Sequence, residues 1–111
     1  MIYVLYSPAS RQQIRDMLVA GSKAVKVVVD IRLGILAGGG DLHVDGEAEL
    51  LAEGCRQEDL WGASWDSVTR RIRYDSMVNL RPQQKNFSPE IQDPAVRARV
   101  AEIINDLLGG I

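Results

Sequence analysis

A chain of 111 residues, 46% of them hydrophobic and 25% charged, is long enough to bury one hydrophobic core and too short for two. Its 13 basic and 15 acidic residues are interleaved rather than grouped, so neither nucleic acid nor an anionic membrane surface is indicated as a partner. The single cysteine and single histidine exclude an intramolecular disulfide and a zinc site of several Cys and His ligands. We therefore expect one domain over residues 1–111, without a metal or other cofactor.

The start of the chain predicts a strand, a helix and a second strand. Residues 2–6 are apolar and lack a basic leader, and no later apolar run approaches the roughly 18 residues of a membrane span, so we expect a cytoplasmic protein. Ser7 can cap a helix that opens at Pro8 and ends at Gly21. The β-branched run 23–31 is the strongest strand signal, and its nearly continuous apolarity is typical of a central strand.

A turn after the central strand leads to a further strand and a short helix. Residues 35–37 are apolar, and the glycine run 38–40 is expected to break or bulge the strand that they form. Apolar and polar residues then alternate over residues 42–45. Asp45 is expected to cap a helix that Gly54 closes.

The second half of the chain predicts two strands, a long loop and a helix. Residues 60–66 and 72–81 alternate with a period of two, and the polar stretch 82–92 is longer than most connections. Asp93 can cap a final helix, which the glycine pair 109–110 ends. The order βαββαββα predicts an α+β fold with a five-stranded mixed sheet and three helices mainly on one side. If the first two strands are parallel neighbours, their crossover is right-handed.

His43 and Asp45 are the first candidate pair for a catalytic or metal-binding site. Two residues apart in an extended strand, they project from the same face, as a metal pair or an oriented general base requires. The alternative is that Asp45 only caps the following helix and that His43 is a partly buried, hydrogen-bonded residue.

A second polar group falls on the predicted strand 72–81. Asp75, Asn79 and Arg81 share one face of it, and Asn86 comes from the following loop, where binding residues are often placed. The alternative is a solvated outer face of the sheet without a specific role.

Two tryptophans and the cysteine are the remaining candidates for functional residues. Trp61 and Trp65 share a strand face and are either a stacking platform or partner anchor, or part of the core. Cys55 lies beside Arg56 and is either a thiolate assisted by that cation or an incidental thiol.

Three blocks together resemble a family of short bacterial proteins of unknown function. The blocks are residues 37–45 (AGGGDLHVD), 57–62 (QEDLWG) and 75–82 (DSMVNLRP), and the resemblance extends from about Val25 to the final helix. It implies a shared fold and a shared site but no reaction. This chain has Lys85 where the family has a glycine before Asn86, which puts the loop conformation in doubt. It has Cys55 where the family usually has serine, which argues against a catalytic cysteine.

The sequence favours a small binding or protein-interaction domain whose partner is an unidentified protein or a second copy of the chain. The residues expected to contact the partner are Trp61, Asp75, Asn79, Arg81 and Asn86.

The alternative is a small hydrolase acting on phosphoesters. There His43 is a general base or metal ligand, Asp45 and Asp75 hold a divalent cation, and Arg81 stabilises the anion.

Overall fold

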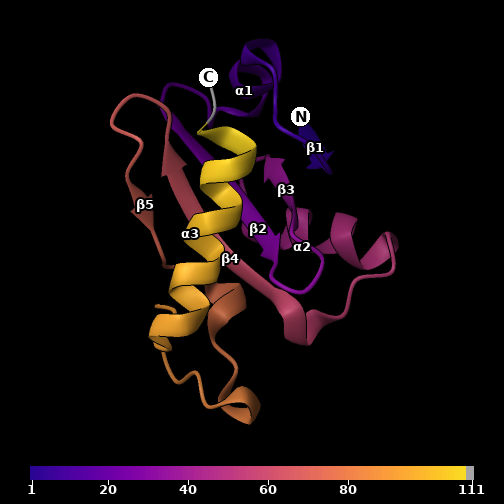
Figure 1. The fold of residues 1–111 in the computed structure, drawn as a ribbon, viewed down its shortest axis with the longest axis vertical. Helices are drawn as coiled ribbons and strands as arrows, with labels where there is room; N and C mark the ends of the chain where they lie inside the picture. The colour runs from indigo at the N-terminus through magenta and orange to yellow at the C-terminus, as the bar shows by residue number, and fades with distance from the viewer. Residues whose placement is uncertain (110–111) are drawn as a thin grey trace.

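A buried strand in the middle of the sheet organises the fold. The run that predicts a central strand forms β2, which pairs with β3 on one side and with β4 on the other. The computed structural model describes residues 1–109 and holds a five-stranded sheet in the order β1-β3-β2-β4-β5 (Figure 1). The strands are β1 (Ile2–Leu5), β2 (Ala24–Asp30), β3 (Ile35–Gly39), β4 (Leu60–Asp66) and β5 (Ile72–Arg73), and the α-helices are α1 (Arg11–Met17), α2 (His43–Ala52) and α3 (Pro94–Leu108).

The predicted α+β class and element order are confirmed, but the predicted mixed sheet is wrong. Every neighbouring pair of strands in this described sheet is antiparallel. β1 and β2 are not neighbours, because β3 returns from β2 through a tight turn and lies between them. In that turn Asp30 Oδ1 accepts the N–H groups of Arg32 and Leu33 at 2.9 and 2.8 Å, and Gly34 has a φ of +73°.

Helices cover both faces of the sheet. Val25, Val27 and Val29 of β2 face the larger core, to which α1 and α3 contribute. Val28 faces the smaller core on the opposite side, together with Leu50 of α2. Figure 1 shows α3 lying lengthwise across β2 and β4. The sequence prediction of helices mainly on one side therefore fits α1 and α3, and α2 is the exception.

α1 begins three residues later than predicted. Ser10, not Ser7, is its N-cap: Ser10 Oγ accepts the Gln13 N–H at 3.1 Å, and Gln13 Oε1 accepts the Ser10 N–H at 2.9 Å. This reciprocal pair satisfies two N–H groups at once, which a Ser7 cap before proline does not. The helix ends when Leu18 adopts an extended conformation, so the predicted end at Gly21 is wrong.

The glycine run ends β3 as predicted, but only after Gly38 and Gly39 have been paired in the strand. A Cβ atom on Gly38 would lie 2.7 Å from Met17 Sδ, and one on Gly39 would lie 2.0 Å from the carbonyl oxygen of Met1. Glycine is therefore required at Gly39 by the close approach of the backbone before β1, whereas a side chain at Gly38 would displace that of Met17.

The strand predicted over residues 42–45 is wrong, because these residues begin α2. Gly39 and Gly40 have φ values of +109° and +76°, and this backbone bend carries the chain out of the sheet. Leu42 is the N-cap of α2, so His43 and Asp45 both lie in its first turn, and Asp45 is not the cap.

The strand predicted over residues 72–81 is wrong beyond its first two residues. Ser76 Oγ accepts the Val78 N–H at 3.3 Å and caps a 3₁₀ helix, η2 (Met77–Asn79), which a second one, η3 (Pro82–Gln84), follows. Asn79 is the last residue of η2, and its side chain hydrogen-bonds to backbone groups of β4 with which a longer β5 would otherwise pair. The Ser76 cap and the Asn79 side chain therefore prevent the strand that the alternating pattern predicts.

α3 is confirmed. Asp93 Oδ1 accepts the Ala95 N–H at 2.8 Å, and Pro94 occupies the first helical position. Gly109 is the C-cap, and Gly110 lies outside the described residues. None of the described helices is long and apolar enough to cross a membrane.

Replacing Lys85 by glycine should stabilise the protein. Lys85 has a φ of +61°, a left-handed conformation that disfavours a side chain. We expect Lys85→Gly to raise the free energy of unfolding by about 0.5 kcal/mol. Relief of the backbone strain stabilises the folded state, and the greater entropy of glycine in the unfolded chain offsets part of this gain. Gln83→Gly, in η3 without the left-handed φ, should lower it. If urea denaturation gives Lys85→Gly a lower free energy of unfolding than Gln83→Gly, this explanation is contradicted.

Candidate functional site

A cleft lies on the sheet face that carries α2. Lys26 and Val28 point to the same side of β2, but α2 covers Val28 and leaves the sheet around Lys26 uncovered. The main hollow has a volume of about 710 Å³ and joins a second one of about 370 Å³, and both are lined by Lys26, Ser64 and Arg73. We call the two together the open-face cleft. The main hollow is also lined by Val19, Ser22, Ala24, Trp65, Asp66, Thr69, Arg71 and Ile72, and the second by His43, Asp75, Ser76, Met77 and Pro89.

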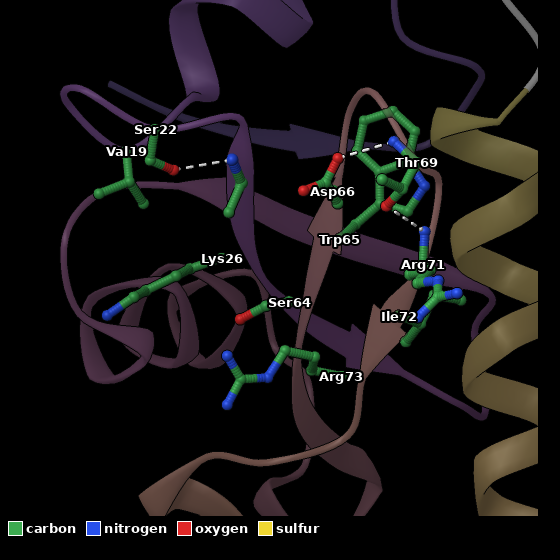
Figure 2. Close-up of a pocket in the computed structure, with 11 residues that line it drawn as sticks. Val19, Ser22, Lys26, Ser64, Trp65, Asp66, Thr69, Arg71, Ile72 and Arg73 are labelled. Atoms are coloured by element: carbon green, nitrogen blue, oxygen red, sulfur yellow. Dashed lines mark hydrogen bonds between the residues drawn. The ribbon is translucent and has the colours of Figure 1, made fainter.

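The three shared residues form a row across the sheet. Lys26 of β2 is the cross-strand partner of Ser64 of β4, which is in turn the partner of Arg73 of β5. Directly opposed residues of antiparallel strands have Cβ atoms about 5 Å apart. Figure 2 shows the Ser64 hydroxyl next to the Arg73 guanidinium, with the Lys26 side chain extending away from both. An ammonium, a hydroxyl and a guanidinium thus come from one row of residues.

The two cations are only partly engaged by other groups. Lys26 Nζ donates one hydrogen bond, to the carbonyl of Asp41 at 2.7 Å. Arg73 Nε forms an ion pair with Asp75 Oδ1 at 3.5 Å, and 78% of the Arg73 side chain is exposed. Such an exposed pair contributes little free energy. Donors on both cations therefore remain for a ligand.

His43 lines the second hollow from the first turn of α2. Its Nε2 donates to the carbonyl of Ala63 at 2.7 Å, which places the proton of the neutral ring on Nε2. Burial lowers the pKa of His43, the hydrogen bond to Ala63 raises it, Lys26 lowers it and Asp75 raises it, with a net decrease. The ring is therefore mainly neutral at pH 7. This matches the hydrogen-bonded, partly buried alternative, in an α-helix instead of a strand.

The four residues of the predicted hydrolase site are separated by the fold. His43 and Asp75 line the same hollow, whereas Asp45 is exposed and lies about 200° around α2 from His43, and Arg81 is buried elsewhere. Within residues 1–109 no three His, Cys, Asp or Glu side chains are grouped in a way that suits a metal ion.

Asn79 is fully buried and takes the place of a neighbouring strand beside Gly62. Its Oδ1 accepts the Gly62 N–H at 2.7 Å, and its Nδ2 donates to the Gly62 carbonyl at 2.9 Å and to the Pro89 carbonyl at 3.0 Å. Gly62 has no room for a side chain, since a Cβ there would lie 2.6 Å from Ser76. The predicted shared strand face of Asp75, Asn79 and Arg81 is therefore wrong.

Arg81 is buried against Trp61 and binds the backbone. Its guanidinium carbon lies 4.2 Å from the centroid of the Trp61 ring. Nη2 donates to the Leu60 carbonyl at 2.6 Å, and Nη1 donates to the Gln57 carbonyl. Burial lowers the pKa of Arg81, while Glu47 and Asp59 raise it. The side chain holds the segment before β4 against the segment after η2.

Asn86 and the tryptophans are also interior. Asn86 is 3% exposed, and its Nδ2 donates to the carbonyls of Asn79, Ser88 and Glu90 at 2.8, 2.9 and 2.9 Å. Trp61 and Trp65 belong to the larger core, as their packing alternative predicts. Of the five residues expected to contact a partner, only Asp75 lines the open-face cleft.

Cys55 is buried beside Asp30. Burial raises the pKa of its thiol to about 11, and Asp30 adds to the rise, so the thiol is protonated at pH 7 and is not a reactive thiolate. The thiol approaches the Asp30 carboxylate without forming a regular hydrogen bond, and Oδ2 of Asp30 has no partner among the described residues.

Lys26, Ser64 and Arg73 are the residues of the cleft that the sequence did not single out. Lys26 is visible as a polar interruption in the most apolar strand, and Ser64 and Arg73 are polar positions in alternating segments. Their alignment depends on the order and pairing of three strands, which periodicity does not determine.

Truncating Asn79 should strongly destabilise the protein. Asn79→Ala removes the partners of both backbone groups of Gly62 and leaves them buried, so we expect a loss of about 3 kcal/mol in the free energy of unfolding. Urea denaturation monitored by tryptophan fluorescence measures it. Asn105→Ala, at an exposed site in α3, is the matched control and should change stability little. Equal stability of the two variants would show that the Asn79 amide does not hold the segment.

Cys55→Ser should be more stable than Cys55→Ala. A serine hydroxyl is a better donor than a thiol and can satisfy Asp30 Oδ2, which is otherwise unpaired. We expect the serine variant to exceed the parent by about 1 kcal/mol and the alanine variant to fall below it. Thermal and urea denaturation of the three proteins measure the ranking, and a serine variant no more stable than the alanine variant would contradict it.

Comparisons with known proteins place the chain in a family. Residues 3–107 match the family described as "Protein of unknown function (DUF5674)", in agreement with the resemblance to a family of unknown function. No curated protein and no solved structure matches the chain. Since the match extends over nearly all of its residues, the chain belongs to this family of unknown function.

Proposed function

We propose that the protein binds a small anionic ligand, bearing a carboxylate or phosphate group, in the open-face cleft. The observation that carries this proposal is the row of Lys26, Ser64 and Arg73 on adjacent strands. A carboxylate or phosphate oxygen accepts from an ammonium, a hydroxyl and a guanidinium, and arginine is suited to bidentate contact with either group.

The charge of the site differs from that of the chain. The whole protein has a formal charge of −2, yet Lys26, Arg71 and Arg73 line the cleft with only Asp66 and Asp75 to oppose them. The Asp66 carboxylate already accepts the N–H groups of residues 68 and 69, both at 2.8 Å. A ligand therefore meets a positive excess in an otherwise acidic protein.

The hydrogen bonds of Asn79 support this site, although Asn79 itself does not line the cleft. Asn79 and Ser76 position the segment that carries Asp75 and Met77 to the rim of the cleft. A binding domain thus remains the favoured function, with a ligand-contacting set that differs from the one expected from sequence.

An anion titration tests the proposal. Inorganic phosphate and acetate, added separately to ¹⁵N-labelled protein at low ionic strength and pH 7, should shift the amide signals of Lys26, Ser64 and Arg73 most. Arg73→Ala and Lys26→Ala should each weaken binding about tenfold, since each removes charge-assisted hydrogen bonds.

Arg11→Ala is the matched control for loss of one positive charge, because Arg11 is exposed on α1, which packs on the opposite face of the sheet. It should retain the parent affinity. Equal weakening by Arg11→Ala would assign the effect to net charge alone, and unchanged binding by Arg73→Ala would refute the site.

A further inference from the structure

We infer that the ligand of the open-face cleft is an amphipathic monocarboxylate, a carboxylate attached to a short apolar chain. This inference rests on the proposed function and names the ligand class of the same site. It is carried by an apolar hollow that opens beside the cationic row.

The apolar hollow has a volume of about 240 Å³ and lies between the start of α2 and η2. Leu42, the N-cap of α2, and Val44 of α2 line one side of it, and Met77 and Val78 of η2 line the other. Leu42, Val44 and Met77 are 56%, 52% and 70% exposed, so three large apolar side chains around one depression face solvent. An apolar chain placed there would remove them from water, which is favourable in proportion to the area covered.

The apolar hollow and the open-face cleft are continuous. Lys26, His43, Ser76 and Met77 line both the apolar hollow and the second hollow of the cleft. A ligand with its charged group on the row of Lys26, Ser64 and Arg73 therefore has a direct path for its chain past the neutral ring of His43. The volume suits a short chain and is too small for a helix of a partner protein.

The charge of the cleft favours a carboxylate over a phosphate as the head group. Three basic side chains, Lys26, Arg71 and Arg73, and two acidic ones, Asp66 and Asp75, line its two hollows, leaving one positive charge in excess. This excess neutralises a singly charged carboxylate, whereas a phosphate monoester carries nearly two negative charges at pH 7.

A series of straight-chain carboxylates tests the inference. Acetate, butyrate, hexanoate and octanoate share the head group and differ only in the apolar chain. Affinity, measured by amide shift titration, should rise about threefold per added methylene until the apolar hollow is full. Leu42→Ser and Val44→Ser, at two residues that line the apolar hollow but not the open-face cleft, should abolish most of this increase and leave the affinity for acetate unchanged. Leu33→Ser, an exposed apolar site in the turn between β2 and β3, should keep the full increase.

The outcomes separate this inference from the proposed function. If acetate or phosphate binds at the row but affinity does not rise with chain length, the amphipathic ligand is refuted and anion binding stands. If the rise persists in both Leu42→Ser and Val44→Ser, the chain binds elsewhere and the inference is refuted. If no carboxylate and no phosphate binds at the row, both proposals fail.

Discussion

The pairing of the Asn79 side chain with the backbone of Gly62 is the constraint on which the second half of the structure depends. It satisfies both polar groups of a buried backbone unit that a short β5 leaves without a strand. The amide can reach only because Gly62 has no side chain and Ser76 packs against its Cα. A continuous strand over this region would have satisfied the same groups but would have extended the sheet edge.

Because β5 stops after two residues, the chain has length left to fold over the end of β4. That length forms the two 3₁₀ helices and the loop closed by Asn86, with Arg81 joining it to the carbonyls of Leu60 and Gln57. η2 is thereby brought beside α2. The second hollow of the open-face cleft and the apolar hollow both have η2 as a wall, so these two hollows depend on the strand being short.

The three blocks quoted for the family resemblance include residues of the supporting network and residues that line the hollows. Gly62, Asn79 and Arg81 lie within the blocks, as do most residues of the apolar hollow, while Lys26, Ser64 and Arg73 lie outside them. The structure also bears on the two positions at which the sequence analysis expects a departure from the family pattern. Lys85 occupies a left-handed conformation that glycine would adopt without strain, and Cys55 lies where a serine would donate to Asp30.

Local signals in the sequence were sufficient for the α+β class, the central strand 24–30 and the helix that Asp93 caps. These depend on interactions within a few residues, namely β-branched packing and the pairing of a cap with the first turn. The outcome for residues 42–45 and 72–81 was decided by contacts between distant segments: the glycine-dependent exit from β3, and an amide 17 residues away in sequence from the backbone that it completes. Alternation shows that residues share a face only if the strand forms. The sequence alone therefore determined the elements that satisfy their own hydrogen bonds, and only the tertiary structure decided which polar side chains are buried supports and which line the open-face cleft.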